Sequence, residues 1–228
     1  MIGQTARQTA SGAPFLFRVA FIAALVLATL YLFAGPLLPD VLWLKAAVKG
    51  AVCPLLALAL WTVRGGDADA RRLSLALLFS AAGDVFLAVD RVGLFVPGLA
   101  SFLLAHLVYL WQFVARRPRP FHLPPVRRLV ALGILLGIGT MLVLLTPGLG
   151  KLLVPVYAYI AAIAAMALAA TALPGRPLVM LGALSFMISD SLIALDKFVA
   201  PIPFVGPAIW ITYVAAQAMI VLGWKDRA

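Results

Sequence analysis

Long apolar runs, separated by short polar or proline-containing stretches, dominate the chain. Crossing a bilayer as a helix takes about 20 apolar residues, and eight runs of that kind are present. We predict helices over residues 15–34, 41–63, 73–90, 94–114, 127–146, 151–172, 177–196 and 206–224. The runs lack the alternation of a barrel strand and are about twice its length. The pattern therefore predicts an all-α, polytopic membrane protein with eight transmembrane helices.

The segments outside these runs are short. We expect residues 1–14 to form a polar N-terminal segment, residues 15–224 a single eight-helix transmembrane domain, and residues 225–228 a C-terminal tail. A small-x-small cleavage site is not evident before Pro36. The first run is therefore expected to be retained as a helix and not removed as a signal peptide.

Composition agrees with a membrane protein. Apolar residues make up 64% of the chain and charged residues 11%, whereas about a quarter of a soluble domain is charged. Soluble globular and disordered proteins are therefore excluded. A net charge of +10 could indicate nucleic acid, but the basic residues lie at the ends of the apolar runs and not on one amphipathic face. We expect membrane lipids, and no nucleic acid, as partners.

The distribution of Lys and Arg predicts the orientation of the helices, because cytoplasmic loops are enriched in both. With the N-terminus inside, the cytoplasmic segments carry thirteen: Arg7, Arg18, Arg64, Arg71, Arg72, Arg116, Arg117, Arg119, Arg127, Arg128, Arg176, Lys225 and Arg227. The opposite side carries Arg91, Lys151 and Lys197. Both termini are therefore predicted to be cytoplasmic, and a bacterial cytoplasmic membrane is the expected location.

Two short segments share one pattern at an offset of 106 residues. "DVFLAVDR" begins at Asp84 and "DSLIALDK" begins at Asp190, and each has an alanine four residues later, a second Asp six residues later and then a base. The offset spans four predicted helices, so both segments run in the same direction, as a parallel repeat requires. A 4+4 internal repeat explains the pattern, and so does coincidence among few residue types.

Ionisable side chains inside the apolar runs are the candidates for function, because a charge at mid-bilayer costs about 2.5–3.5 kcal/mol. They are Lys45, Lys49, Asp84, His106 and Asp190. Asp84 and Asp190 each lie about six residues before the predicted outer end of their helix, which is about 9 Å below that surface. We expect the two carboxylates to meet in one pocket. Ion bridges that only fix helix packing are the alternative.

Further polar residues follow helical spacing. Tyr109 comes three residues after His106, and Gln217 comes four residues after Tyr213, so each pair shares one helix face. These residues are expected to bind substrate or to support the site. Ordinary hydrogen bonding between helices, worth about 0.6 kcal/mol a bond, is an equally good explanation.

Other chemistry is not expected from this sequence. Asp90 and Asp196, each followed by a base, are interpreted as ion pairs at the membrane boundary. The single cysteine, Cys53, excludes an intramolecular disulfide. With two histidines on different faces and no glutamate, a zinc site is improbable, so no metal and no cofactor are predicted.

Four sequence blocks resemble a known family. "LLFSAAGDVFLAVD" followed by "GLASFLLAHLVYLWQF", and "GALSFMISDSLIALDKF" followed by "ITYVAAQAMIVLG", are similar to the motif blocks of the YhhN family of integral membrane proteins, which includes lysoplasmalogenases. The resemblance covers residues 45–223, in the family's order and spacing. The family has a lysine close before a proline in its second helix. Here "KGAVCP" separates Lys49 from Pro54 by five positions, so the equivalent lysine is Lys45 or Lys49.

The resemblance implies a hydrolase that cleaves the vinyl ether of lysoplasmalogens, which are lysophospholipids, to a fatty aldehyde and glycerophosphoethanolamine or glycerophosphocholine. The family motif residues that it carries over are Asp84, His106, Tyr109, Asp190, Tyr213 and Gln217.

Vinyl ether cleavage begins with protonation of the alkene carbon and proceeds through an oxocarbenium ion that water captures. Two carboxyl groups serve a similar transition state in glycosidases, so Asp84 and Asp190 are expected to act as acid and base, in an order that stays open. His106 or Tyr213 would position the water. A lysine close to the carboxylates would favour the ionised form of both, so Lys45 and Lys49 are assigned to the substrate phosphate.

Two other classes of protein are compatible with the same intramembrane polar residues. A proton-coupled lipid or small-molecule carrier could use the same pair of intramembrane carboxylates. A receptor or scaffold would keep the polar cluster dry and closed.

Overall fold

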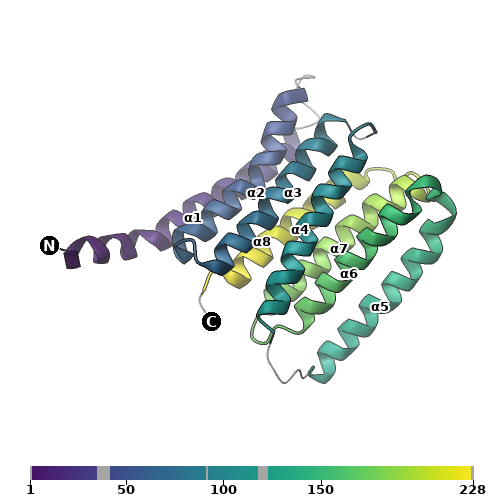
Figure 1. The fold of residues 1–228 in the computed structure, drawn as a ribbon. Helices are drawn as coiled ribbons and strands as arrows, with labels where there is room; N and C mark the ends of the chain where they lie inside the picture. Colours follow the sequence, from purple (N-terminus) through teal and green to yellow (C-terminus); the bar gives the residue numbers. More distant parts are fainter. Residues whose placement is uncertain (1, 35–41, 91, 118–122, 227–228) are drawn as a thin grey trace. The chain divides into compact units, whose positions relative to one another are not determined.

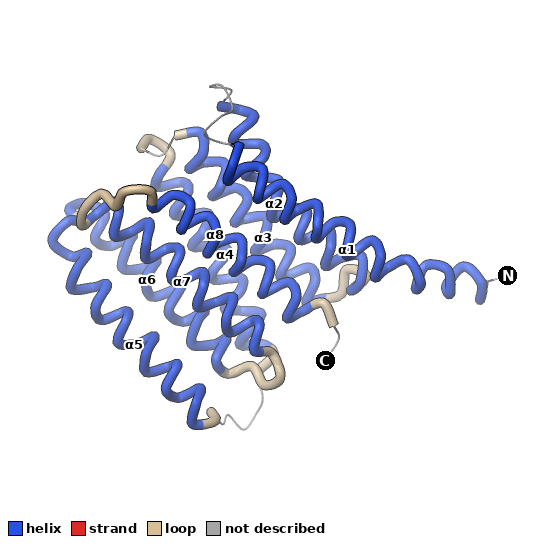
Figure 2. The backbone as a smooth tube through the Cα atoms, turned by 180° about the vertical axis from the view of Figure 1, so that it is seen from behind, coloured by secondary structure: helices blue, strands red, loops and turns tan. Residues whose placement is uncertain are grey.

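The computed structural model describes residues 2–34, 42–90, 92–117 and 123–226, and helices dominate them (Figure 1). This part of the chain contains no strand (Figure 2). The helices are α1 (Ile2–Ala34), α2 (Leu42–Arg64), α3 (Ala68–Val89), α4 (Phe95–Ala115), α5 (Pro125–Leu145), α6 (Leu153–Thr171), α7 (Pro177–Phe198) and α8 (Val205–Trp224). Two short 3₁₀ turns, Thr146–Gly148 and Gly150–Leu152, join α5 to α6.

Each predicted apolar run is confirmed as a helix that is long and apolar enough to cross a membrane. The protein is therefore an integral, multi-pass membrane protein. In α1 the apolar span is Gly12–Phe33, and the helix itself begins earlier, at Ile2. Helix α3 begins five residues before its predicted start, because Asp67 caps it by accepting a hydrogen bond from the Ala70 N–H at 2.9 Å. The orientation, the internal repeat and the division into domains stay predictions.

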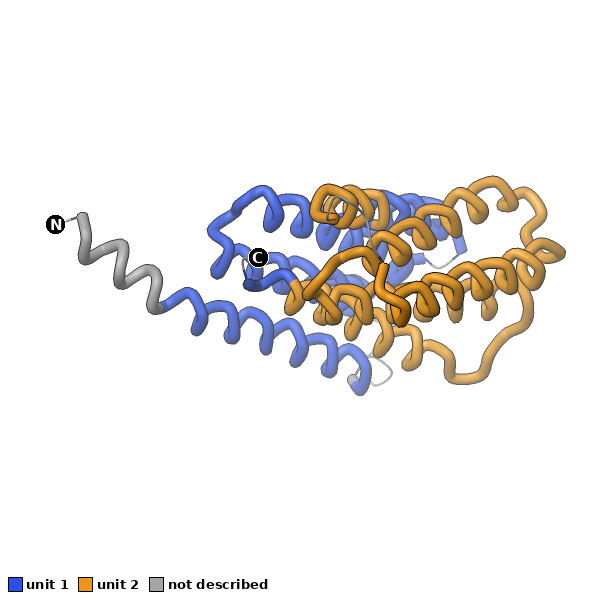
Figure 3. Tube along the Cα trace, turned by 90° about the horizontal axis from the view of Figure 1, so that it is seen from below, with its two compact units in different colours: residues 1–105, 224–228 blue, residues 106–223 orange. Residues whose placement is uncertain are grey.

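The chain forms two compact units (Figure 3). Unit 1 comprises residues 1–105 and 224–228, and unit 2 comprises residues 106–223. Helix α4 contributes to both, since its residues up to Ala105 belong to unit 1 and those from His106 belong to unit 2.

In unit 1, α2 packs against both α1 and α3. Two glycines mark close approaches between helices. A Cβ on Gly50 of α2 would lie 2.5 Å from the Val85 side chain of α3, and a Cβ on Gly83 would lie 2.6 Å from the Phe102 ring of α4. Small residues allow helices to approach this closely in membrane proteins. Because lipid is as apolar as the helix surfaces, helices there are held together by close packing and hydrogen bonds.

In unit 2, α6 packs against α5 and α7. Hydroxyl groups join α7 to α8, because Ser185 donates to the Thr212 carbonyl at 2.7 Å and Ser189 donates to the Ile209 carbonyl at 2.9 Å. At Gly182 of α7, an added Cβ would lie 2.8 Å from a backbone oxygen of α8. These contacts fix the seam between α7 and α8 from Gly182 to Ser189.

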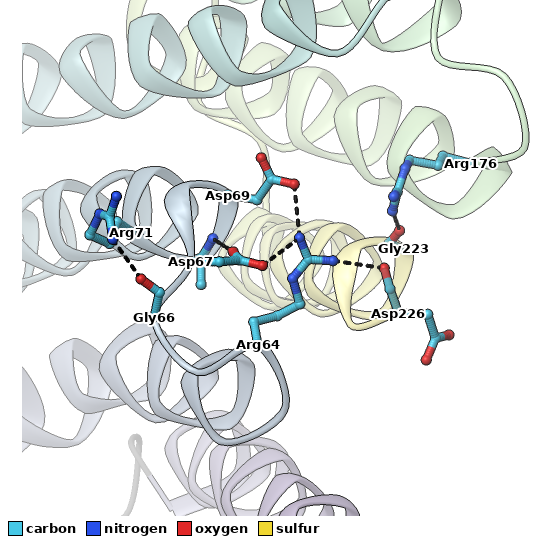
Figure 4. Close-up of polar contacts among 9 residues, drawn as sticks. Arg64, Gly66, Asp67, Asp69, Arg71, Arg176, Gly223 and Asp226 are labelled. Carbon is cyan, nitrogen blue, oxygen red and sulfur yellow. Dashed lines mark hydrogen bonds and ion pairs between the residues drawn. The ribbon is translucent and has the colours of Figure 1, made fainter. Parts of the chain in front are cut away.

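Arg64, at the end of α2, is buried and anchors the C-terminal segment within unit 1 (Figure 4). Its Nη2 lies 2.8 Å from Asp67 Oδ2 and 2.9 Å from Asp69 Oδ2. Its Nη1 donates to the Asp226 backbone carbonyl at 3.0 Å. The guanidinium group therefore ties the turn between α2 and α3 to the residues that follow α8.

Two arginines of unit 2 also donate to carbonyls at helix ends. Arg127 Nη1 donates to the Thr171 carbonyl at 2.9 Å and to the Leu173 carbonyl at 2.5 Å. Arg176 donates to the Gly223 carbonyl (Figure 4). Cations at helix C-termini satisfy carbonyl groups that have no partner inside the helix. Basic residues counted as signals of orientation therefore also act as caps.

Asp90 and Asp196 accept backbone hydrogen bonds from the loops that follow α3 and α7. Asp90 Oδ1 accepts from the Val92 N–H at 2.8 Å and from the Gly93 N–H at 2.9 Å. Both bonds lower the pKa of Asp90 below its ordinary value, and the bond from Gly93 has the larger effect. Asp196 Oδ1 accepts from the Ile202 N–H at 2.8 Å. Arg91, the base expected beside Asp90, lies outside the described residues.

Substituting Gly182→Ala tests the seam between α7 and α8. The new methyl group would press on backbone atoms of α8, and overpacking of this kind costs about 1–3 kcal/mol. We expect a lower thermal midpoint in detergent. Gly137→Ala on α5 is the matched control, because nothing lies within 4 Å of its Cβ position. A midpoint for Gly182→Ala equal to that of Gly137→Ala would contradict the close approach.

Candidate active site

Asp84 forms an ion pair with Lys49 inside unit 1. The carboxylate is 2% exposed, and its Oδ1 lies 3.2 Å from the Lys49 Nζ. The glycine of the close approach, Gly50, directly follows Lys49 and faces Val85, which directly follows Asp84. The tight seam between α2 and α3 thus brings the ammonium to the carboxylate.

This contact changes the expectation for the two lysines. From the sequence, both lysines are expected to bind the substrate phosphate, since a lysine beside a carboxylate would disturb the acid–base scheme. The structure places the Lys49 ammonium against Asp84, where it stabilises negative charge on that group. Lys49 therefore belongs to the Asp84 cluster. Phosphate binding by Lys45, half-buried one turn earlier, stays a prediction.

Asp190 is the centre of a second cluster, in unit 2. The Tyr159 hydroxyl donates to Asp190 Oδ2 at 2.5 Å, and the His106 Nε2 lies 3.6 Å from the same oxygen. The His106 side chain is fully buried, and the Asp190 side chain is 12% exposed. Three helices contribute to this cluster: α4 provides the imidazole, α6 the phenol and α7 the carboxylate.

Aromatic rings hold the Asp190 cluster in place. The His106 ring meets Tyr159 edge-on at 5.2 Å between ring centroids and meets Phe186 at 4.6 Å. Phe186 in turn meets Tyr213 of α8 at 5.4 Å. Edge-to-face contacts of this kind are favourable and restrict ring orientation. Tyr213 is therefore connected to His106 through Phe186.

Tyr109 and Gln217 form a buried hydrogen bond between α4 and α8. The phenol donates to the amide Oε1 at 2.6 Å, and both side chains are fully buried. The other half of the amide, Nε2, has no hydrogen-bond partner among the residues that the structure describes. A buried amide N–H group without an acceptor is costly, so this group can bind an oxygen of a ligand or of a water molecule.

The structure thus groups the predicted residues in two places. Lys49 and Asp84 belong to unit 1, whereas His106, Tyr109, Asp190, Tyr213 and Gln217 belong to unit 2. The meeting of the two carboxylates stays a prediction. Sequence reasoning missed Tyr159, whose apolar run gives no polar stripe at helical spacing. Across the described ranges, no group of three or more His, Cys, Asp or Glu could hold a metal ion.

Comparisons with known proteins show the family to which the chain belongs. A model of the YhhN family matches residues 44–224. The human lysoplasmalogenase TMEM86B is 36% identical, over 79% of this chain and 75% of that protein. The lysoplasmalogenase of Mycobacterium tuberculosis is 36% identical, over 79% and 70%, and the bovine lysoplasmalogenase TMEM86A is 34% identical, over 79% and 78%. No solved structure matches the chain significantly.

Substituting Tyr109→Phe tests the buried bond to Gln217. Without the phenol, the amide oxygen stays buried and loses its donor, which costs about 1–3 kcal/mol. We expect a lower thermal midpoint in detergent. Tyr157→Phe is the control, since the hydroxyl of Tyr157 contacts Thr146 at an exposed position. Equal midpoints for both variants would mean that the Tyr109 bond does not stabilise the protein.

Proposed function

Because the chain belongs to the YhhN family, we propose that it is a membrane-embedded hydrolase that cleaves the vinyl ether bond of lysoplasmalogens. The products are a fatty aldehyde and glycerophosphoethanolamine or glycerophosphocholine. The similarity to proteins named lysoplasmalogenase, at 31–36% identity over 79% of the chain, carries this proposal. A bacterial cytoplasmic membrane is the proposed location.

The first step of the proposed reaction is protonation of the alkene. Asp190, as a carboxylic acid, gives its proton to the alkene carbon that is not bonded to oxygen. The π electrons form the new C–H bond, and the positive charge is shared between the ether oxygen and its alkene carbon. Asp84 is the ionised member of the pair. The Lys49 ammonium at 3.2 Å supports that role, because it stabilises the negative charge of Asp84.

The second step is capture of the oxocarbenium ion by water. As the water oxygen bonds to the charged carbon, Asp84 takes the proton that the water releases. The resulting hemiacetal then collapses. Its hydroxyl proton returns to the Asp190 carboxylate, and the leaving glycerol oxygen takes the proton from Asp84. The two aspartates thereby recover their starting states, as acid–base catalysis requires.

The remaining polar residues have supporting roles in this scheme. We assign the orientation of the water to His106, which lies beside Asp190, or to Tyr213, which is connected to His106 through Phe186. To the Gln217 amide, whose oxygen accepts from Tyr109, we assign a hydrogen bond from Nε2 to an oxygen of the bound lipid. Lys45 is assigned to the phosphate of the head group.

Substituting the aspartates tests the mechanism. Asp84→Asn and Asp190→Asn should each lower aldehyde release from a lysoplasmalogen by about 10²–10⁴-fold, because each removes an acid–base group. If both act on one substrate, the double variant should lose little more than either single variant. Losses that multiply would mean that the carboxyl groups act independently. A folded single variant with wild-type rates would remove that residue from the mechanism.

The lysine assignment has its own test. Lys49→Met should lower kcat by at least about tenfold, because Asp84 loses a charged partner, whereas Lys49→Arg should keep part of the rate. Lys45→Met should mainly raise KM, as expected for a group that binds phosphate. Size-exclusion profiles in detergent establish that the variants are folded. Equal effects of Lys45→Met and Lys49→Met on kcat would contradict the separate roles.

The aldehyde-release assay also distinguishes the hydrolase from a proton-coupled carrier. An enzyme turns over in detergent, where a carrier has no second compartment and produces no aldehyde. Turnover by the purified wild-type protein in micelles would therefore support the hydrolase, and its absence would favour the carrier.

A further inference from the structure

Tyr159 is a polar residue in contact with Asp190 that neither the motifs nor the spacing of polar residues indicated. It belongs to α6, which packs directly against the α7 helix of Asp190 (Figure 1). Its side chain is 8% exposed. Its hydroxyl donates to Asp190 Oδ2 at 2.5 Å, which is at the short end of the range for O–H···O bonds to carboxylates.

We propose that Tyr159 is a positioning residue that fixes the carboxyl group of Asp190 for proton transfer. This inference rests on the proposed function. It adds a residue of α6 to a reaction that the motif blocks assign to α3, α4, α7 and α8.

The position of the Tyr159 hydroxyl is determined by its ring contacts. The ring meets His106 edge-on, with an interplanar angle of 86°. The His106 ring in turn packs against the Phe186 ring. Aromatic rings packed in this way have few alternative orientations. The donor therefore stays at one place, and the carboxyl oxygen that it contacts is held with it.

A fixed donor at this place assists the chemical step. When Asp190 gives its proton to the alkene carbon, negative charge develops on its two oxygens. A preorganised O–H group that already points at one of them stabilises this charge without reorganisation. The Tyr159 proton stays on the phenol throughout, and the group acts only through Asp190.

Tyr159→Phe tests the proposal, because it removes the hydroxyl and keeps the ring that packs on His106. Tyr157→Phe is the matched control: it lies two residues earlier on the same helix and also loses a hydroxyl contact, the one to Thr146. We expect Tyr159→Phe to lower kcat at least about tenfold with little change in KM, and Tyr157→Phe to leave both unchanged. In an Asp190→Asn background, Tyr159→Phe should have little further effect.

An infrared measurement tests the contact without turnover. In protein labelled with ¹³C at the aspartate carboxyl carbons, the difference between wild type and Asp190→Asn isolates the Asp190 band from those of the other aspartates. Tyr159→Phe should shift this band, and Tyr157→Phe should not. Thermal midpoints in detergent show whether either variant is misfolded.

The outcomes separate the two proposals. A shifted band together with a lower kcat supports the positioning role. An unshifted band overturns it, and so does a shifted band with an unchanged kcat in an active enzyme. If the wild-type protein releases no aldehyde, the proposed function is overturned and the positioning role falls with it. A shifted band would then show that the contact itself was correctly identified.

Discussion

A carboxyl group inside a membrane-spanning helix needs a polar partner, because lipid offers it neither water nor counter-ions. In each unit the partner comes from the helix that precedes the aspartate in the chain. Lys49 of α2 meets Asp84 of α3, and Tyr159 of α6 meets Asp190 of α7. Each contact selects one face of each helix and so determines how that pair of helices packs. The candidate chemistry and the packing of these seams therefore depend on the same few side chains.

Small residues make these contacts geometrically attainable. The glycine that brings α2 and α3 together, Gly50, is the neighbour of Lys49, and the glycine that brings α3 against α4, Gly83, is the neighbour of Asp84. A side chain at Gly50 would push α2 away from α3, lengthen the Lys49–Asp84 ion pair and leave Asp84 in apolar surroundings, whereas one at Gly83 would press on the Phe102 ring of α4. A gain in local helix propensity from replacing such a glycine, at most about 1 kcal/mol, would not offset a separated and desolvated pair.

The sequence was sufficient for the helices because crossing lipid is a local property of about 20 consecutive residues. The sequence was insufficient to predict which side chains contact each other, because those contacts depend on the faces by which the helices pack. Tyr159 lies in a mostly apolar run, and nothing in its spacing distinguishes it from Tyr157, whose hydroxyl contacts Thr146 instead. Lys49 had two chemically reasonable partners, a phosphate and a carboxylate, and spacing could not decide between them. Likewise, the excess of arginine predicts an orientation, but it does not identify the carbonyl groups to which Arg127 and Arg176 donate, because these lie far away in the chain.

The resemblance between the two Asp segments extends from sequence to contacts. In both, the first aspartate is held by the preceding helix, and the second, Asp90 or Asp196, accepts backbone N–H groups of the following loop. These shared contacts are what a 4+4 internal repeat would produce, and the repeat stays a prediction. The partners of the first aspartates nevertheless differ, an ammonium for Asp84 and a phenol for Asp190. A reaction that needs one proton donor and one carboxylate is helped when the two groups have different surroundings, so this difference in partners makes separate roles for the two aspartates chemically reasonable.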